Sequence, residues 1–213
     1  MTRRAPRALW MIVPPLLLAA CGSLFKNTAA PPTMYVLSAG PREPAEAPND
    51  ALIHTDVAVL RPRVRTGLDT ERIAALYPDR RLDYFANVRW SGPLDEVLQE
   101  LAVQVLGSNA VMRNARAEAS VFASPYWLEI EVRDFQAEYS SPDAAPTTHV
   151  RFLARLGSAN ERRVLAHLES DVHEAAAENR MSAIIDAYNR AADKALAEIA
   201  AGAVQALTSQ PGR

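Results

Sequence analysis

The most chemically reactive residue of this 213-residue chain is its single cysteine, Cys21. One thiol cannot form an intrachain disulfide bond or a thiolate metal cluster, so neither kind of site is expected. A thiol can instead act as a nucleophile and become covalently modified. The residues that precede Cys21 therefore indicate which covalent modification its thiol undergoes.

The first twenty residues have the pattern of a secretory signal peptide. Three arginines precede an apolar run at residues 8–18, which Pro14 and Pro15 interrupt. The run is too short and too broken by proline to cross a bilayer of about 30 Å as a helix. We therefore assign residues 1–20 to a cleaved signal peptide.

Leu18, Ala19 and Ala20, directly before Cys21, resemble the lipobox of bacterial lipoproteins. This resemblance implies that the thiol takes a diacylglycerol group and that cleavage before Cys21 frees an amine for a further acyl chain. Two or three acyl chains hold a protein on a membrane, whereas one chain binds only marginally. Because Gly22 follows, and not Asp, the resemblance implies the periplasmic face of the outer membrane over the inner membrane. The alternative is a chance cysteine beside an ordinary cleavage site.

The composition argues against nucleic acid as a partner. The formal net charge is −2 for the whole chain, and it becomes −5 once the three arginines of the signal peptide are removed. Nucleic-acid binding needs an excess of positive charge, and only 7% of the residues are aromatic and able to stack on bases. The mature protein is thus expected to stay at a membrane through acyl chains and not through basic residues.

The histidines are the other residues that could do chemistry; they are His54, His149, His167 and His173. His167, Glu169, Asp171 and His173 alternate along an expected strand and so share one of its faces. Successive ligands on one face of a strand lie about 7 Å apart, so a closed metal site would need residues from other segments. We interpret these residues as the solvent-exposed face of a strand and expect no metal site.

No motif for catalysis is present. The chain has neither a G-x-S-x-G nucleophile motif nor a glycine-rich phosphate-binding loop. Seven arginines between Arg61 and Arg89 could form a patch for an acidic partner, but acids in the same segment favour a charge-balanced surface. We therefore expect a protein that is not an enzyme, with no catalytic residues and no cofactor besides the acyl chains on Cys21.

Apolar periodicity predicts a single α+β domain. Residues 21–50 resemble a Pro-rich tether with a short strand at 34–37, and residues 51–213 form the expected domain. The expected strands lie at 57–64, 73–77, 81–86, 127–135, 149–156 and 163–172, and the expected helices at 93–106 and 179–208. This βββα-βββα order predicts two layers, a mainly antiparallel sheet with both helices packed on one face.

Cross-strand ion pairs are expected on the solvent side of that sheet. Glu129 and Glu131 alternate with apolar residues on one expected strand, as Arg151 and Arg155 do on the next. Opposite charges on neighbouring strands stabilise an antiparallel pair. We therefore expect these acids to pair with these arginines.

The segment Arg89-Trp90-Ser91-Gly92-Pro93-Leu94, followed by an amphipathic helix, resembles the ABC-type transport auxiliary lipoproteins, the PqiC-like group. Further points of resemblance are Tyr35-Val36-Leu37, Val57-x-x-Leu60-x-Pro62, Leu68-Asp69 and the C-terminal amphipathic helix. The resemblance covers nearly all of the mature chain. It departs from the family at Thr66-Gly67, where an aromatic residue is common, and in the length of the Pro-rich loop at 39–50.

This resemblance implies a role as a partner. Such lipoproteins accompany MCE proteins and an inner-membrane ABC permease and ATPase in lipid transport across the envelope. The PqiC-like group implies docking of the MCE protein at the outer membrane, with a homo-oligomeric ring as one form. We take Arg89, Trp90, Tyr126 and Trp127 as candidate partner contacts, although burial beneath the first helix is the favoured interpretation of Trp90.

Two alternative functions stay open at this point. The first is a stand-alone lipoprotein that holds a hydrophobic ligand between the sheet and the helices. The second is a structural or assembly lipoprotein of another envelope complex. Both share the anchor at Cys21 and differ in the partner.

Substitution of Cys21 tests the anchor. Cys21→Ala removes the only thiol, so the protein should be found in the soluble periplasm or as an unprocessed precursor. Membrane fractionation and mass measurement of the processed chain distinguish these states. Unchanged outer-membrane fractionation of a processed Cys21→Ala protein would refute the anchor.

Overall fold

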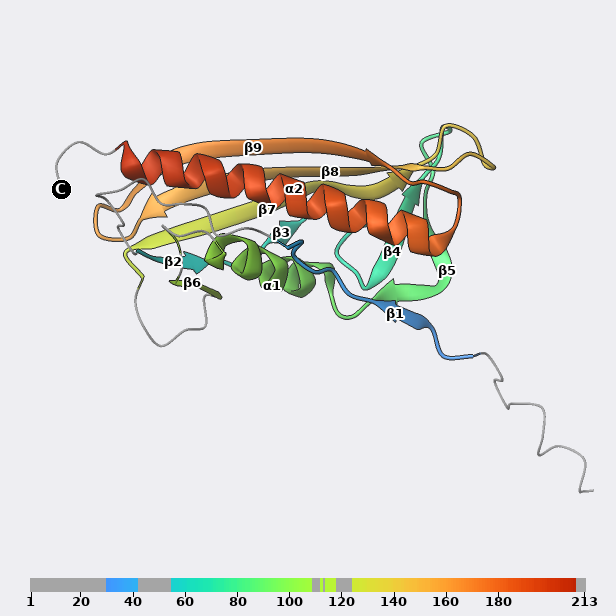
Figure 1. The fold of residues 1–213 in the computed structure, drawn as a ribbon, viewed down its shortest axis with the longest axis horizontal. Helices are drawn as coiled ribbons and strands as arrows, with labels where there is room; N and C mark the ends of the chain where they lie inside the picture. Colours follow the sequence, from blue (N-terminus) through green and yellow to red (C-terminus); the bar gives the residue numbers. More distant parts are fainter. Residues whose placement is uncertain (1–29, 42–54, 109–111, 113, 118–123, 210–213) are drawn as a thin grey trace, which may run out of the picture. The chain divides into compact units, whose positions relative to one another are not determined.

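β7 (Tyr126–Glu138) is the strand around which the sheet is arranged. The computed structural model describes residues 30–41, 55–108, 112, 114–117 and 124–209, and Pro32–Arg213 form one compact unit. One edge of β7 pairs antiparallel with β8 (Thr147–Ser158), which in turn pairs antiparallel with β9 (Arg163–Ala175). These three long strands form a meander that spans the unit (Figure 1).

The opposite edge of β7 is paired with three short strands in succession. β2 (Asp56–Val59), β3 (Arg63–Val64) and β4 (Arg72–Leu76) lie parallel to its beginning, middle and end. Pro62 separates β2 from β3, as expected of a residue that cannot donate a backbone hydrogen bond to a sheet. Hydrogen bonding to β7 resumes after Pro62, since the Arg65 amide donates to the Val132 carbonyl at 3.1 Å.

Three further strands widen the sheet beyond these. β6 (Asn114–Ala117) lies parallel to β2, and β5 (Leu82–Trp90) lies antiparallel to β4. β1 (Thr33–Tyr35) pairs parallel with β5 at the outer edge. The strand that the sequence places in the tether therefore belongs to the sheet.

α1 (Leu94–Gly107) and α2 (Met181–Thr208) cover the same face of the sheet (Figure 1). α2 packs on β8 and β9 and also contacts α1. Four alanines at every fourth position, from Ala183 to Ala195, line its buried side and allow a close approach. At Gly202 an added Cβ would lie 2.8 Å from Leu168 Cδ2 of β9. Neither helix is long and apolar enough to cross a membrane, within the residues described.

Four aromatic rings fill the centre of the core between the helices and the sheet. Trp90, at the end of β5, meets Tyr188 of α2 edge-on, with ring centroids 5.2 Å apart. Phe135 of β7 contacts Tyr188 at 5.1 Å and stacks on Phe152 of β8 at 6.4 Å. The Tyr188 hydroxyl donates to the Ala74 carbonyl of β4 at 2.8 Å, and burial raises the pKa of this hydroxyl well above its usual value.

A β-bulge keeps the two faces of β7 distinct along its whole length. The register with β8 shifts by one residue at Arg133. Leu128 and Val132 face the core before the bulge, and Phe135 and Ala137 face it afterwards. The charged residues of β7 consequently stay on the side away from the helices on both sides of the bulge.

The predicted α+β class with two helices is confirmed. The long strands pair antiparallel as expected, whereas β2, β3 and β4 are parallel to β7. β6 was not predicted. The alternation of apolar residues along 163–172 predicts that Val164 faces the core, and this prediction is wrong. A bulge at Leu165 sets Val164 opposite Gly157 and leaves it 36% exposed.

Tyr188→Phe tests the hydrogen bond between α2 and β4. Removal of the hydroxyl leaves the Ala74 carbonyl without this donor in a buried position, so the free energy of unfolding should fall by about 1–3 kcal/mol. Tyr77→Phe is the matched control, because the Tyr77 hydroxyl has no hydrogen-bond partner among the described residues. Urea unfolding of both variants measures the difference, and equal stabilities would contradict the assignment.

Candidate functional site

The predicted lipidation site lies outside the described residues. Cys21 and the lipobox residues Leu18, Ala19 and Ala20 precede Ala30, where the described part begins. Nine residues lead from Cys21 to Ala30, and a fully extended chain of that length spans roughly 30 Å. Lipidation of Cys21 stays a prediction.

Arg89 and Trp90 end β5 with their side chains on opposite sides of the sheet. Trp90 is 1% exposed within the aromatic core, so it offers a partner no surface in this fold. Arg89 is half-exposed and donates from Nη1 to Glu71 Oε2 at 3.2 Å. Its Nε is buried with no hydrogen-bond partner. Of this pair, Arg89 is the residue placed to meet another molecule.

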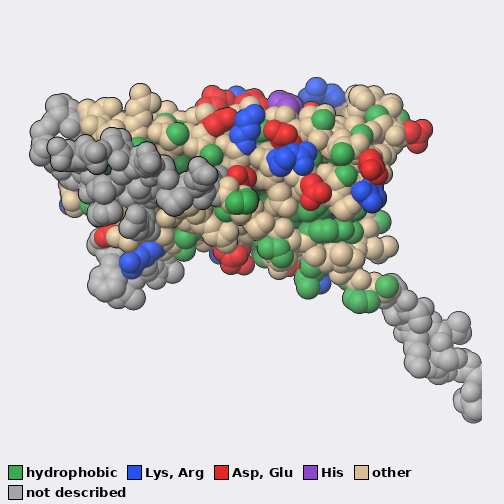
Figure 2. Space-filling view, viewed as in Figure 1, with side chains coloured by type: hydrophobic (Ala, Val, Ile, Leu, Met, Phe, Trp, Pro, Cys, Tyr) green, Lys and Arg blue, Asp and Glu red, His purple; other side chains and the backbone are tan. Residues whose placement is uncertain are grey.

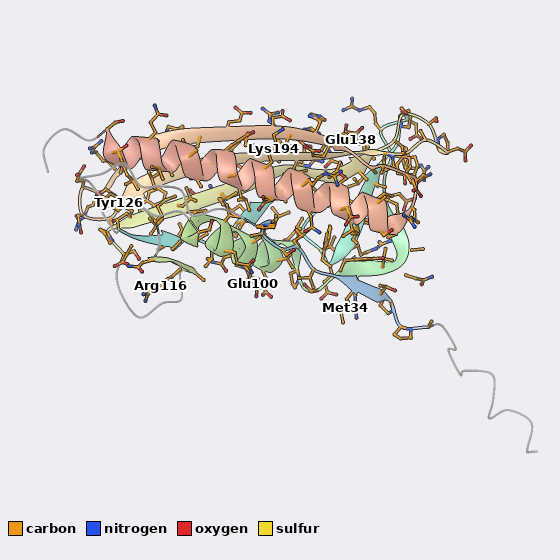
Figure 3. All side chains as sticks on the ribbon, viewed as in Figure 1. Met34, Glu100, Arg116, Tyr126, Glu138 and Lys194 are labelled. Atoms are coloured by element: carbon orange, nitrogen blue, oxygen red, sulfur yellow. The ribbon has the colours of Figure 1, made fainter. Side chains whose placement is uncertain are left out.

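Tyr126 and Trp127 are the first two residues of β7, and their side chains also point to opposite sides of the sheet. Tyr126 is 6% exposed on the core side, at the opposite end of the strand from Glu138 (Figure 3). Trp127 is half-buried on the other side, with its ring over Gly157 of β8, the residue opposite it in the register. An added Cβ at Gly157 would lie 2.1 Å from Trp127 Cζ2. Trp127 stays a candidate contact, whereas Tyr126 is mostly covered.

The side chains of β7, β8 and β9 that point away from the helices form a polar surface, which we call the outer face. It comprises Trp127, Glu129, Glu131, Asp134, Gln136 and Glu138 on β7, His149, Arg151, Leu153 and Arg155 on β8, and His167, Glu169, Asp171 and His173 on β9. The prediction that the last four share one side of a strand is confirmed. The sheet thus has an apolar side under the helices and a charged side opposite.

Near Trp127, the outer face has a cavity of about 420 Å³ bordered by ion pairs. Glu129 accepts a hydrogen bond from Arg155, which confirms one predicted pair, and lies 2.5 Å from Arg63 Nη2. Glu131 instead pairs with Arg133 at 3.0 Å, because the register sets Leu153 opposite it. The charges that line this cavity largely neutralise one another.

The predicted pairing of Arg151 with an acid of β7 at position 129 or 131 is wrong. Arg151 donates from Nη2 to Glu169 Oε1 of β9 at 2.6 Å, and this hydrogen bond raises the pKa of the guanidinium. The bulge in β7 sets Asp134 opposite Arg151, and Asp134 pairs with Arg65 at 3.3 Å. Single-strand patterns carry no information on such register shifts.

At the end of β7 near Glu138, five outer-face residues form what we call the histidine cluster: Gln136, Glu138, His149, Asp171 and His173. Glu138 Oε1 lies 2.8 Å from His149 Nδ1 and accepts from Gln136 Nε2 at 3.0 Å. His149 Nε2 lies 2.9 Å from Asp171 Oδ1, and the His149 and His173 rings stack with centroids 4.0 Å apart. A cavity of about 510 Å³ opens beside Glu138 and His149. Sequence reasoning missed this convergence, because it depends on the register of three strands.

The arginines between Arg61 and Arg89 are largely paired. Arg61 donates to Asp95 and Glu96 at the start of α1; these bonds raise the pKa of Arg61 and lower that of Asp95. Arg81 pairs with two acids of its own hairpin. The pairing favours the charge-balanced surface over a patch for an acidic partner.

Exposed apolar side chains gather around β1. Met34 is 59% exposed and Val36 is 63% exposed. On the helix-covered side, hydrophobic side chains are visible around this edge strand (Figure 2), and Met34 points away from the sheet (Figure 3). The edge at β1 therefore contrasts with the ion-paired outer face.

Comparison with known proteins identifies one family. A family model described as "ABC-type transport auxiliary lipoprotein component" matches residues 35–200. The fold is shared with a crystal structure of a Xanthomonas campestris protein, with a TM-score of 0.67 and 19% identity over 83% of this chain and 94% of that one. A second crystal structure, of an uncharacterized protein, has a TM-score of 0.61 and 16% identity over 81% and 99% of the two chains. No curated protein matches the sequence.

Gly157→Ala tests the packing of Trp127 on β8. Because the new Cβ would overlap the indole ring, Trp127 must move, and the free energy of unfolding should fall by about 1–3 kcal/mol. Gly92→Ala is the control, since its Cβ would meet nothing closer than 3.9 Å. Thermal unfolding of both variants measures the difference in stability. Equal melting temperatures would show that the Trp127 ring does not occupy this position.

Proposed function

Because this chain belongs to the family of ABC-type transport auxiliary lipoprotein components, we propose that it is a non-enzymatic lipoprotein of an MCE-type lipid-transport system in the cell envelope. In this proposal it docks or supports the MCE protein at the outer membrane, and the MCE protein works with an ABC permease and ATPase. The observation that carries the proposal is the family match over residues 35–200, which includes every helix and strand except the start of β1 and the end of α2.

The membrane attachment in this proposal rests on Cys21. A lipidated Cys21 would sit nine residues before Ala30, so the folded unit could begin roughly 30 Å or less from the membrane surface. Acyl chains supply the attachment that a chain of net negative charge cannot obtain from anionic lipids. Gly22 supports the outer membrane as the destination.

The polar groups support a binding role over catalysis. On the outer face, the arginines and most of the acids are paired with one another across the strands. Among the described residues, no serine or threonine hydroxyl is hydrogen-bonded to a histidine, the arrangement that activates a hydroxyl for nucleophilic attack. A rigid, ion-paired sheet suits a docking component.

A hydrophobic ligand between the sheet and the helices is less well supported. That space is occupied by the aromatic cluster around Tyr188, whose rings contact both layers. The two cavities described above lie on the outer face of the sheet, on the side away from the helices, and charged side chains border both of them. We therefore retain the docking role as the proposed function.

Co-purification tests the proposed function. The full-length lipoprotein, tagged at its C-terminus and expressed at its natural level, is extracted from membranes in mild detergent and its partners are identified by mass spectrometry. An MCE protein should be enriched at least about tenfold over a mock purification, and the ABC permease and ATPase should accompany it.

The Cys21→Ala variant is the control for attachment in this experiment. Loss of the acyl chains should reduce recovery of the MCE protein from the membrane fraction without unfolding the domain, which circular dichroism checks. A wild-type purification that yields no MCE protein, although the cells demonstrably contain it, would reject the proposal.

A further inference from the structure

Three metal-ligating side chains from three adjacent strands converge in the histidine cluster. Glu138 comes from the end of β7, His149 from β8 and His173 from β9. One ligand atom from each lies within 4.8 Å of the others. His149 and His173 are directly opposite in the register of β8 and β9, so the sheet itself holds them together.

Both ring nitrogens of His149 face carboxylate oxygens. Nδ1 lies 2.8 Å from Glu138 Oε1 and Nε2 lies 2.9 Å from Asp171 Oδ1. An imidazole with one N–H group donates from one nitrogen, and the lone pair of the other nitrogen can bind a metal ion. An ion between Nδ1 and Glu138 would satisfy that contact while the N–H group at Nε2 donates to Asp171.

The surroundings supply the second imidazole of the site. The His149 ring is stacked on that of His173, with ring centroids 4.0 Å apart. Glu138 has no Arg or Lys partner within the described part of the chain, whereas Asp134 pairs with Arg65 and Glu169 with Arg151. Among the described residues, the contacts of Glu138 are therefore with His149 and Gln136 and not with Arg or Lys, which leaves its carboxylate available as a metal ligand.

We propose that Glu138, His149 and His173 form a binding site for one divalent transition-metal ion, with zinc as the ion that this donor set fits best. Zinc takes imidazole nitrogen and carboxylate oxygen at about 2.0–2.1 Å in tetrahedral geometry, which sets its ligands about 3.4 Å apart. Separations of up to 4.8 Å require only small rotations. The His173 side chain is 52% exposed, so it has room to rotate, and its Nδ1 lies 3.5 Å from Asp171 Oδ1.

Asp171 is placed to hold the His149 ring in position for this site. With a metal ion at Nδ1 of His149, the Nε2–H group donates to Asp171 Oδ1 at 2.9 Å. A carboxylate behind a metal-bound imidazole fixes the orientation of the ring and increases its basicity. The position left for a fourth ligand, such as water, is on the side of the 510 Å³ cavity that Glu138 and His149 line. The ion would join β7, β8 and β9 at one end of the meander.

Titration calorimetry with zinc chloride tests the site. The full-length lipoprotein is purified in detergent without a polyhistidine tag and stripped of metal with a chelator. We expect saturable binding of one zinc ion, weakened at least about tenfold by His173→Ala and by Glu138→Gln. His167→Ala is the matched control, since His167 lies on the same face of the same strand but six residues away; this variant should bind zinc as the wild type does.

Two further readouts keep the test decisive if a variant is less stable. Zinc should raise the melting temperature of the wild type and of His167→Ala but not that of His173→Ala. Cobalt chloride should give the visible absorption of a nitrogen- and oxygen-ligated ion of low coordination number. An absence of saturable binding, or binding unaffected by His173→Ala, would overturn the proposal. The outcome is independent of co-purification with an MCE protein.

Discussion

The fold depends on β7 being able to present one apolar and one charged side over thirteen residues. Simple alternation would not achieve this, because its apolar residues change from even to odd positions at Arg133. The bulge at that residue absorbs the change, so the apolar residues of β7 stay on the core side along the whole strand, and Phe135 joins the aromatic cluster. The other strands are arranged around β7. β8 pairs with one edge of β7, and β2, β3 and β4 pair in succession with the other edge. α2 covers the apolar side through a row of alanines that lets it approach closely.

The same constraint creates the outer face. Because most core-facing positions are apolar, most charged residues of the three long strands lie on one side, where cross-strand pairing compensates most of them. Glu174 of β9 is an exception and pairs with Arg190 and Lys194 of α2. Exposed ion pairs stabilise a protein little, so this surface is better understood as a rigid polar platform than as a source of stability. In the histidine cluster, Asp171 pairs with Arg151, whereas Glu138 has no Arg or Lys partner among the described residues. The apolar surface around Met34 lies elsewhere, on the edge strand β1.

Local periodicity was sufficient to predict the class of the fold, the two helices, the exposed side of β9 and the burial of Trp90. Each of these depends on which residues within one segment are apolar. Register could not be predicted, because it depends on which residue of one strand lies opposite which residue of another. For that reason the expected pairing of Arg151 was wrong and the convergence of Glu138 with His149 and His173 was missed. β6 was missed because its sequence, Asn-Ala-Arg-Ala, is short and its only apolar residues are alanines, which have a low strand propensity. The lipid anchor rests on a motif outside the described residues and on no feature of the fold.

Site-specific photo-crosslinking in intact cells can show whether this protein docks an MCE protein and through which surface. A photoreactive residue replaces Met34 on the β1 edge, Trp127 on the outer face or Glu100 on the exposed side of α1, one position at a time. These positions sample three different surfaces of the folded unit. At least one surface should yield an adduct in which mass spectrometry identifies an MCE protein, and this adduct should be lost when Cys21 is replaced by alanine. Adducts without an MCE protein at all three positions, in cells that contain one, would contradict the proposed docking role.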